Sequence, residues 1–144
     1  MKVSFFKGAV LPSILCLCLV GLFMACSHDM PVAQQQPQPP ANLQATLSSI
    51  QATIFTPKCT NPGCHPGGGA PMSLQPGQSF ANLVNVNSAY GRLRVAPGNA
   101  NNSALYLKVI GNSAGGRMPL GGQPLSQAET DTIAAWINRG ALNN

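Results

Sequence analysis

The stretch Cys59-Thr60-Asn61-Pro62-Gly63-Cys64-His65 holds two thiols close together, with an imidazole directly after the second thiol. A Cys-x-x-Cys-His run is the attachment signature of a c-type haem, in which the thiols bond to the haem vinyl groups and the imidazole binds the iron. Four residues separate the cysteines in this chain instead of two. The run is therefore a longer version of that signature, and a zinc site and a disulfide bond are the alternatives.

Residues 1–25 are predicted to be an export signal. Lys2 and Lys7 precede an apolar run from about Ala9 to Ala25, and a basic start followed by such a run is typical of a secretory signal. The run is about as long as the shortest membrane-spanning helices, which need roughly 20 apolar residues. Its position at the N-terminus favours a signal over a permanent span.

The signal ends in Leu22-Phe23-Met24-Ala25-Cys26-Ser27, where a small residue precedes a cysteine, as in a bacterial lipobox. This pattern predicts lipidation of Cys26, which becomes the first residue of the mature protein. The alternative is an ordinary signal peptide with an incidental cysteine. Ser27, in place of Asp, favours sorting to the outer membrane. We therefore expect an exported, lipid-anchored protein on the periplasmic side of that membrane.

The five cysteines of the chain support this division. Cys16 and Cys18 leave with the signal, and Cys26 takes lipid. Cys59 and Cys64 then remain as a pair, with no thiol left over in an exported protein.

Residues 26–41 are rich in Pro and Gln and show no apolar periodicity. Such a segment is expected to be a spacer, partly extended as polyproline II, and His28 within it is expected to be solvated. The folded domain is predicted over residues 42–144, about 100 residues, which suffices for one modest core.

The first helix of this domain is predicted from an apolar stripe, with Asn42 as its N-cap and its end near Pro57. The stripe consists of Leu43, Leu47, Ile50 and Ile54. The last helix is predicted from a capping box of Ser126 and Glu129 and a left-handed end at Gly140. Its apolar face consists of Ile133, Trp136 and Ile137.

Two shorter helices are expected between these, over Ser79 to about Val84 and over Ser103 to Ile110. The chain has 15 Gly and 13 Pro, a smaller share than the roughly 25–30% of disordered low-complexity chains. No strand pattern or internal repeat is present. The predicted fold is all-α, with about four short helices and long Gly/Pro-rich loops. With one thiol pair it is no disulfide scaffold, so a buried cofactor is expected to complete the core.

Basic residues exceed acidic ones, with 8 Lys and Arg against 3 Asp and Glu. Arg92 and Arg94 are the nearest approach to a basic cluster, so the charge gives no case for nucleic-acid binding. Two haem propionates would offset most of the excess in the mature chain, and Arg92 or Arg94 is a candidate to pair with one of them.

If haem is bound, His65 is the proximal ligand and a soft or imidazole donor is needed on the other face. The candidates are His28 and Met30 in the spacer, Met72, and Met118. Met72 follows His65 by only seven residues, so reaching the opposite face would be hard.

Met118 fits better, because it lies in the glycine-rich loop 115–122. Glycine lets a backbone approach a flat ligand closely, and Pro119 stiffens the loop. The alternative is a methionine that fills a gap in the core. Two further expectations are that the Pro71 carbonyl orients the proximal imidazole, and that Tyr106 and Phe80 form part of the pocket wall.

The order of these features resembles a monohaem class I c-type cytochrome domain, and more closely the planctomycete-type cytochrome c domains of exported bacterial proteins. The resemblance covers about Leu43 to Asn144. It rests on Ile54-Phe55, Gly63-Cys64-His65, Leu83-Val84-Asn85-Val86, Arg94-Val95, Pro97-Gly98-Asn99, Leu105-Tyr106-Leu107-Lys108, Gly116-Arg117-Met118-Pro119, Trp136-Ile137 and Gly140-Ala141. Wide cysteine spacing occurs in that group. The resemblance implies a haem pocket between the first and last helices, Trp136 near their crossing, and haem attachment outside the cytoplasm.

The expected function is one-electron transfer between a donor and an acceptor redox protein, by one covalent haem c held by Cys59 and Cys64 and ligated by His65 and Met118. No enzyme activity is expected. The alternatives are a haem-based small-ligand sensor, a peroxidase-like enzyme with an open axial site, and a non-haem binding lipoprotein with a disulfide. A peroxidase would need a distal acid–base pair, which the sequence does not show. Zinc would need a fourth ligand.

Overall fold

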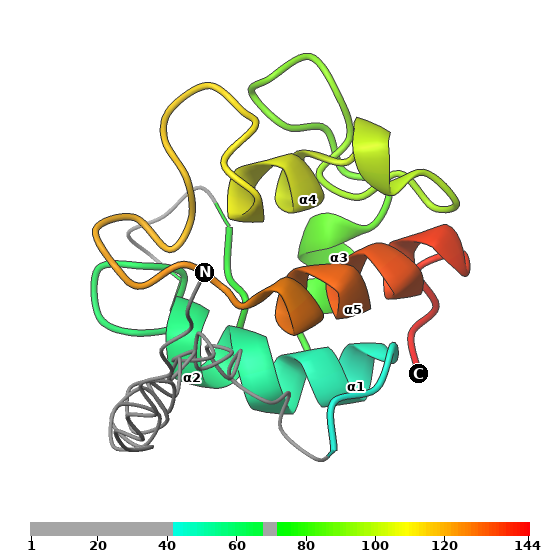
Figure 1. Ribbon diagram of the computed structural model, residues 1–144, viewed down its shortest axis with the longest axis horizontal. Helices are drawn as coiled ribbons and strands as arrows, with labels where there is room; N and C mark the ends of the chain where they lie inside the picture. Colours follow the sequence, from blue (N-terminus) through cyan, green and yellow to red (C-terminus); the bar gives the residue numbers. More distant parts are fainter. Residues whose placement is uncertain (1–41, 68–71) are drawn as a thin grey trace, which may run out of the picture. The chain divides into compact units, whose positions relative to one another are not determined.

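The structure is a computed structural model that describes residues 42–67 and 72–144 (Figure 1). This part of the chain is a small helical domain of about four helices without strands. No helix in it is long and apolar enough to cross a membrane. The predictions for the signal, Cys26, His28, Met30, the spacer and Pro71 lie outside the described residues.

The first helical run comprises α1 (Leu47–Ile50), a π-helical turn η1 (Gln51–Phe55) and α2 (Thr56–Cys59). Its N-cap is Thr46, whose hydroxyl accepts from the Ser49 N–H at 3.3 Å. The prediction of Asn42 as N-cap is therefore wrong. Leu43 packs against the core from outside the helix, and this extended the apolar stripe beyond the true helix start.

The run ends two residues after Pro57, at Cys59, close to the predicted end near Pro57. The Thr56 N–H donates to the carbonyl of Gln51, five residues back, which is the hydrogen bond of a π-helix. This wider turn precedes Pro57, which lies in the first turn of α2, where proline is tolerated. The helix thereby continues to Cys59 and delivers this cysteine at its last position.

The middle of the domain contains α3 (Ser79–Leu83), the 3₁₀ turn η2 (Ala100–Asn102) and α4 (Ala104–Val109). The predictions of helices over Ser79 to about Val84 and over Ser103 to Ile110 are confirmed. Between α3 and η2 the chain forms two isolated bridges, which pair Val84 with Val95 and Asn87 with Leu93.

The last helix, α5 (Gln127–Asn138), begins as predicted. The Ser126 N–H donates to the Glu129 carboxylate at 2.9 Å, and the Ser126 hydroxyl accepts from the Glu129 N–H at 3.3 Å. After the helix, Gly140 has a positive φ of 100°. The predicted apolar face is buried, with Ile133, Trp136 and Ile137 in the core.

Helix α5 contacts both α1 and α4 and thus joins the first helical run to the middle of the domain (Figure 1). The end of the chain returns to the start of α1, where Asn144 accepts from two backbone N–H groups, that of Leu47 at 3.1 Å and that of Ser48 at 2.7 Å. These are donors that a helix N-terminus leaves unpaired. The buried indole of Trp136 donates to the carbonyl of Leu142 at 2.9 Å.

Candidate functional site

An apolar pocket that opens to solvent lies beside this core, with a cavity volume of about 160 Å³. Binding sites for small molecules and cofactors are typically concave and lined mainly by apolar side chains. Its apolar walls come from all the main helices and the connecting loops. The buried wall residues are Ile54, Phe55, Leu74, Leu83, Ala104, Leu105, Val109, Leu125 and Ile133.

Three of the four predicted haem-binding residues line this pocket: Cys59, His65 and Met118. The first two follow the first helical run, and the third comes from the loop before α5. In Figure 1 these two loops project at the same end of the described domain. Cys64 is half-buried and is not part of the lining.

The loop from Cys59 to His65 is closed by its own backbone. The His65 N–H donates to the Cys59 carbonyl at 2.8 Å, and the Cys64 N–H donates to the Asn61 carbonyl at 2.9 Å. The four residues between the cysteines are thus folded into a turn, and the cysteine and histidine at its two ends are held together.

The imidazole of His65 is oriented by a backbone carbonyl. Its Nδ1 lies 3.3 Å from the carbonyl oxygen of Met72, and a carbonyl can only accept, so Nδ1 carries the proton. In the neutral ring, Nε2 then has a free lone pair, the arrangement usual for a histidine that binds a metal. A second bond, from the Leu74 N–H to the His65 carbonyl at 2.9 Å, fixes the backbone.

The same contact bears on the choice between the two methionines of the pocket. Met72 also lines it, but its carbonyl is bonded to the Nδ1 edge of the His65 ring. Its backbone therefore lies on the histidine side. Met118 reaches the pocket from a different segment, where its N–H donates to the Lys108 carbonyl at 2.9 Å. The two methionines therefore enter the pocket from separate segments, with only Met72 attached beside the His65 ring.

The thiol of Cys59 is poorly suited to chemistry that needs a thiolate. Burial raises its pKa to about 11, with a further contribution from the neighbouring thiol of Cys64. At neutral pH the thiol is protonated, and both cysteines are free thiols in the structure. A neutral sulfur against an apolar wall suits a thioether better than a zinc thiolate.

The arrangement of the described residues gives no support for a zinc site either. Within 42–67 and 72–144, no group of three His, Cys, Asp or Glu side chains is placed to hold a metal ion. Besides the Cys59 thiol, the pocket is lined by the imidazole of His65 and the thioethers of Met72 and Met118, and thioethers suit a haem iron better than a zinc ion.

An ion pair ties the helix that ends at Cys59 to the start of α5. Lys58 donates to the Glu129 carboxylate at 2.5 Å, and the Glu129 side chain is only 6% exposed against 39% for Lys58. Burial acts to raise the pKa of Glu129. The hydrogen bonds from Lys58 and Ser126 outweigh burial and hold that pKa below its ordinary value.

Arg94 lines the pocket and donates to the Asn82 carbonyl at 2.8 Å, whereas Arg92 is not part of the lining. Tyr106 and Phe80, which are predicted to form part of the pocket wall, pack against the hydrophobic core and are not among the described residues that line the pocket. On α4 the lining residues are Ala104, Leu105, Lys108 and Val109, which form two pairs four residues apart on one side of the helix.

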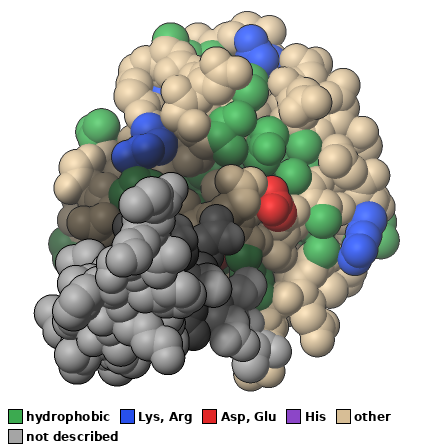
Figure 2. Space-filling model, viewed as in Figure 1, with side chains coloured by type: hydrophobic (Ala, Val, Ile, Leu, Met, Phe, Trp, Pro, Cys, Tyr) green, Lys and Arg blue, Asp and Glu red, His purple; other side chains and the backbone are tan. Residues whose placement is uncertain are grey.

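Two pocket residues, Tyr90 and Lys108, were not predicted. The Lys108 ammonium lies 4.3 Å from the centre of the Tyr90 ring. Lys108 lies within a predicted helix with an apolar face. Its contact with Tyr90, 18 positions earlier, could not be predicted from any local sequence pattern. Figure 2 shows apolar side chains over the middle of one face, with Lys and Arg side chains spread apart on it.

Comparisons of this chain with known proteins found no match among protein-family models, curated proteins or solved structures.

Proposed function

We propose that this chain is an exported, lipid-anchored monohaem c-type cytochrome that carries one electron at a time between two redox proteins. One observation carries the proposal: an apolar pocket is bordered by Cys59 and His65 from one segment and by Met118 from another, more than fifty residues later. The pocket's apolar walls and its imidazole and sulfur donors fit a haem group.

In this proposal the residues around the pocket have separate roles in holding haem. Cys59 and Cys64 would hold haem through thioether bonds, each thiol adding across one vinyl group so that its hydrogen goes to the neighbouring carbon. His65 would bind the iron through Nε2, because its Nδ1 edge faces the carbonyl of Met72. Met118 would supply the second iron ligand through its sulfur, and Arg94, which lines the pocket, would be the partner of a propionate.

When bound, haem would supply a one-electron redox centre, and ligation by His and Met raises its reduction potential. The chain around it would keep water away, because the wall side chains on α3, α4 and α5 are buried and apolar. Two strong axial donors would leave no open position for small molecules. Covalent attachment would prevent loss of the cofactor outside the cell.

The competing functions draw less support from the pocket. A peroxidase-like site needs an acid–base pair beside the open position, and no Asp or Glu is present among the described pocket-lining residues. A disulfide-containing binding protein would leave unexplained why His65 and Met118 line the same pocket as Cys59.

The proposal is tested by expression of the full chain together with cytochrome c maturation machinery. We expect haem that stays with the polypeptide after denaturation, and a reduced spectrum typical of a low-spin c-type haem. The variant His65→Ala should lose the low-spin spectrum, and the double variant Cys59→Ser/Cys64→Ser should lose covalent haem. Arg139→Met, an exposed change on α5's far end, serves as the control. Absence of covalent haem in the parent protein would refute the proposal.

The lipid anchor is tested separately. A labelled fatty acid should be incorporated into the parent protein and not into Cys26→Ser. The protein should fractionate with the outer membrane, as the residue after the cysteine suggests. Incorporation that survives the Cys26→Ser change would contradict the proposed anchor without bearing on the haem.

A further inference from the structure

Lys108 is a buried cation at the edge of the pocket, with a residue exposure of 8%. Its ammonium donates to the carbonyl of Ala114 in a short hydrogen bond and to the carbonyl of Gly116 at 3.4 Å. It also lies over the Tyr90 ring, 4.3 Å from the ring centre. A buried ammonium is costly unless it is paired with such partners, and a cation over an aromatic face within about 6 Å is one of them.

The same residue holds the loop of Met118 through its backbone. The Lys108 carbonyl accepts from the Met118 N–H at 2.9 Å. Lys108 therefore contacts the loop at three alternate positions: the carbonyls of Ala114 and Gly116, and the amide of Met118. A residue at the end of α4 thus fixes the path of the chain that leads to the proposed axial sulfur.

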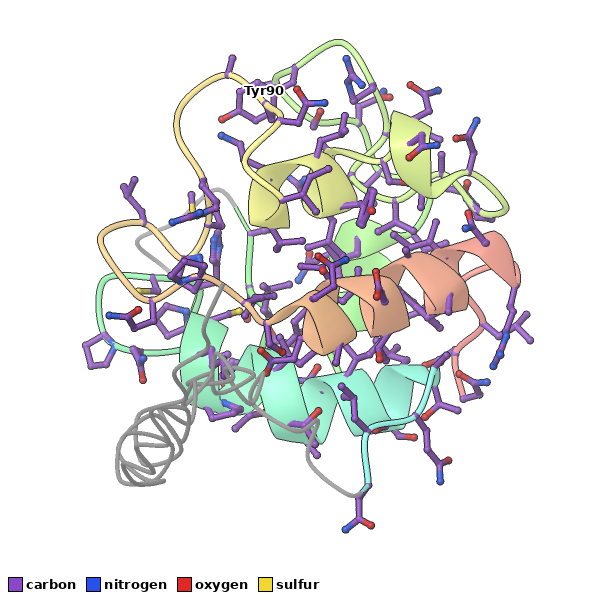
Figure 3. The ribbon with its side chains drawn as sticks, in the orientation of Figure 1. Tyr90 is labelled. Atoms are coloured by element: carbon purple, nitrogen blue, oxygen red, sulfur yellow. The ribbon has the colours of Figure 1, made fainter. Side chains whose placement is uncertain are left out.

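Tyr90 and Gly115 complete this arrangement, and Figure 3 labels Tyr90, which lies above α4 in that view. A Cβ atom on Gly115 would lie 3.0 Å from the Lys108 nitrogen and 3.2 Å from the Tyr90 hydroxyl, and the φ of Gly115 is +79°. Any side chain at position 115 would thus be strained and would push against the ammonium. The loop can close on Lys108 because this position is glycine.

We propose that Lys108, held over Tyr90, is a positioning residue that sets the place of Met118 in the pocket. The role assigned to Met118 rests on the proposed function, whereas the attachment of the loop to Lys108 does not. Lys108 does not serve as a propionate partner in this proposal, because its ammonium is already engaged by two carbonyls and the tyrosine ring.

The test uses the full chain as isolated after expression with the maturation machinery. Lys108→Met keeps the buried stem and removes the charge and its donors, and Lys108→Arg restores a charge and donors. Tyr90→Leu removes the ring, and Tyr90→Phe keeps it. The matched control is Arg139→Met, which removes an exposed cation beyond α5.

Three readouts report on the loop. Amide hydrogen exchange at Met118 measures whether its N–H remains bonded to Lys108. The weak far-red band of the oxidised protein reports the bond between methionine sulfur and iron. The rate of carbon monoxide binding to the reduced protein reports how often the axial position opens.

For Lys108→Met we expect about tenfold faster exchange at Met118 and about tenfold faster carbon monoxide binding, because one hydrogen bond from a charged donor is worth roughly that factor. The far-red band should weaken. Lys108→Arg should recover part of each change, Tyr90→Leu should show a smaller change of the same sign, and Tyr90→Phe should match the parent. Tyr90→Leu also provides a test if Lys108→Met does not fold.

Two results would overturn the proposal: exchange at Met118 in Lys108→Met equal to that in Arg139→Met, or a uniform rise in exchange over all amides with the far-red band intact. If the protein carries no haem at all, the proposed function fails. The exchange at Met118 in that same isolated protein would still decide whether Lys108 holds the loop.

Discussion

Removing Lys58 should lower the free energy of unfolding more than removing Glu129, its partner in the ion pair. Glu129→Gln removes the negative charge and keeps a residue that suits the third position of a capping box. Lys58→Met removes the positive charge and leaves a carboxylate whose side chain is 6% exposed, whereas the lysine side chain is 39% exposed. A charge left unpaired in a buried position costs more than one that water can reach.

The structure sets the expected magnitudes. In Glu129→Gln the freed ammonium is rehydrated, so we expect a loss of about 1–2 kcal/mol in the free energy of unfolding, above the ~0–1 kcal/mol of an exposed pair. In Lys58→Met we expect about 3 kcal/mol, at the low end for a broken buried pair. For a domain of about 100 residues, each kcal/mol corresponds to roughly 4–8 °C in Tm.

The pH dependence has a fixed sign. The pKa of Glu129 lies below its ordinary value of 4.5 in the folded protein, so the unfolded chain takes up the proton first as the pH falls. The stabilisation is therefore complete above about pH 4.5 and is lost as the pH falls through the lowered folded pKa. The difference between the parent and Glu129→Gln should shrink over that window.

Urea unfolding followed by circular dichroism, at neutral and acidic pH, measures these differences. Asp131→Asn is the control, because Asp131 is an exposed acid on the same helix, bonded only to the nearby side chain of Gln127 among the contacts described. It should change stability by less than about 0.5 kcal/mol. If Lys58→Met cost no more than Glu129→Gln, the reasoning from unequal burial would be refuted.

Three further outcomes are expected. Met118→Ala should open an axial position, so that carbon monoxide binds the reduced protein readily and the far-red band disappears; unchanged carbon monoxide binding would show that Met118 is not the ligand. Ser126→Ala should lower the unfolding free energy by about 1 kcal/mol through the lost cap of α5, measured by thermal unfolding. Trp136→Phe should cost about 1–3 kcal/mol in urea unfolding, because the fully buried indole loses volume in the core and its hydrogen bond to the Leu142 carbonyl; an unchanged stability would contradict this.

The helices that the sequence predicts well are those whose signals are local. Ser126 and Glu129 identify the start of α5 by themselves, since a capping box needs only residues three positions apart. The start of the first helix was missed because Leu43 packs against the core without belonging to the helix, which begins after Thr46. Periodicity of apolar residues cannot distinguish such a residue from one on the helix itself.

The π-helical turn and the residues around Met118 depend on tertiary structure. Pro57 usually marks a helix end, and only the wider turn before it lets the run continue to Cys59. Cys59, His65 and Met118 were selected by their chemistry, and the structure places all three at one pocket. Lys108 and Tyr90 carry no such signal, because a lysine in a helix and a tyrosine in a loop are ordinary until the fold brings them together.

Asn144 docks at the start of α1, and Asn42 contacts the same turn, because its carbonyl accepts from the Ser49 hydroxyl at 3.1 Å. Both ends of the domain that the structure describes therefore lie at the start of the first helical run. Cys59 lies at the other end of that run, about 20 Å away at 1.5 Å per residue. A tag joined to either end of this domain would therefore be attached away from Cys59.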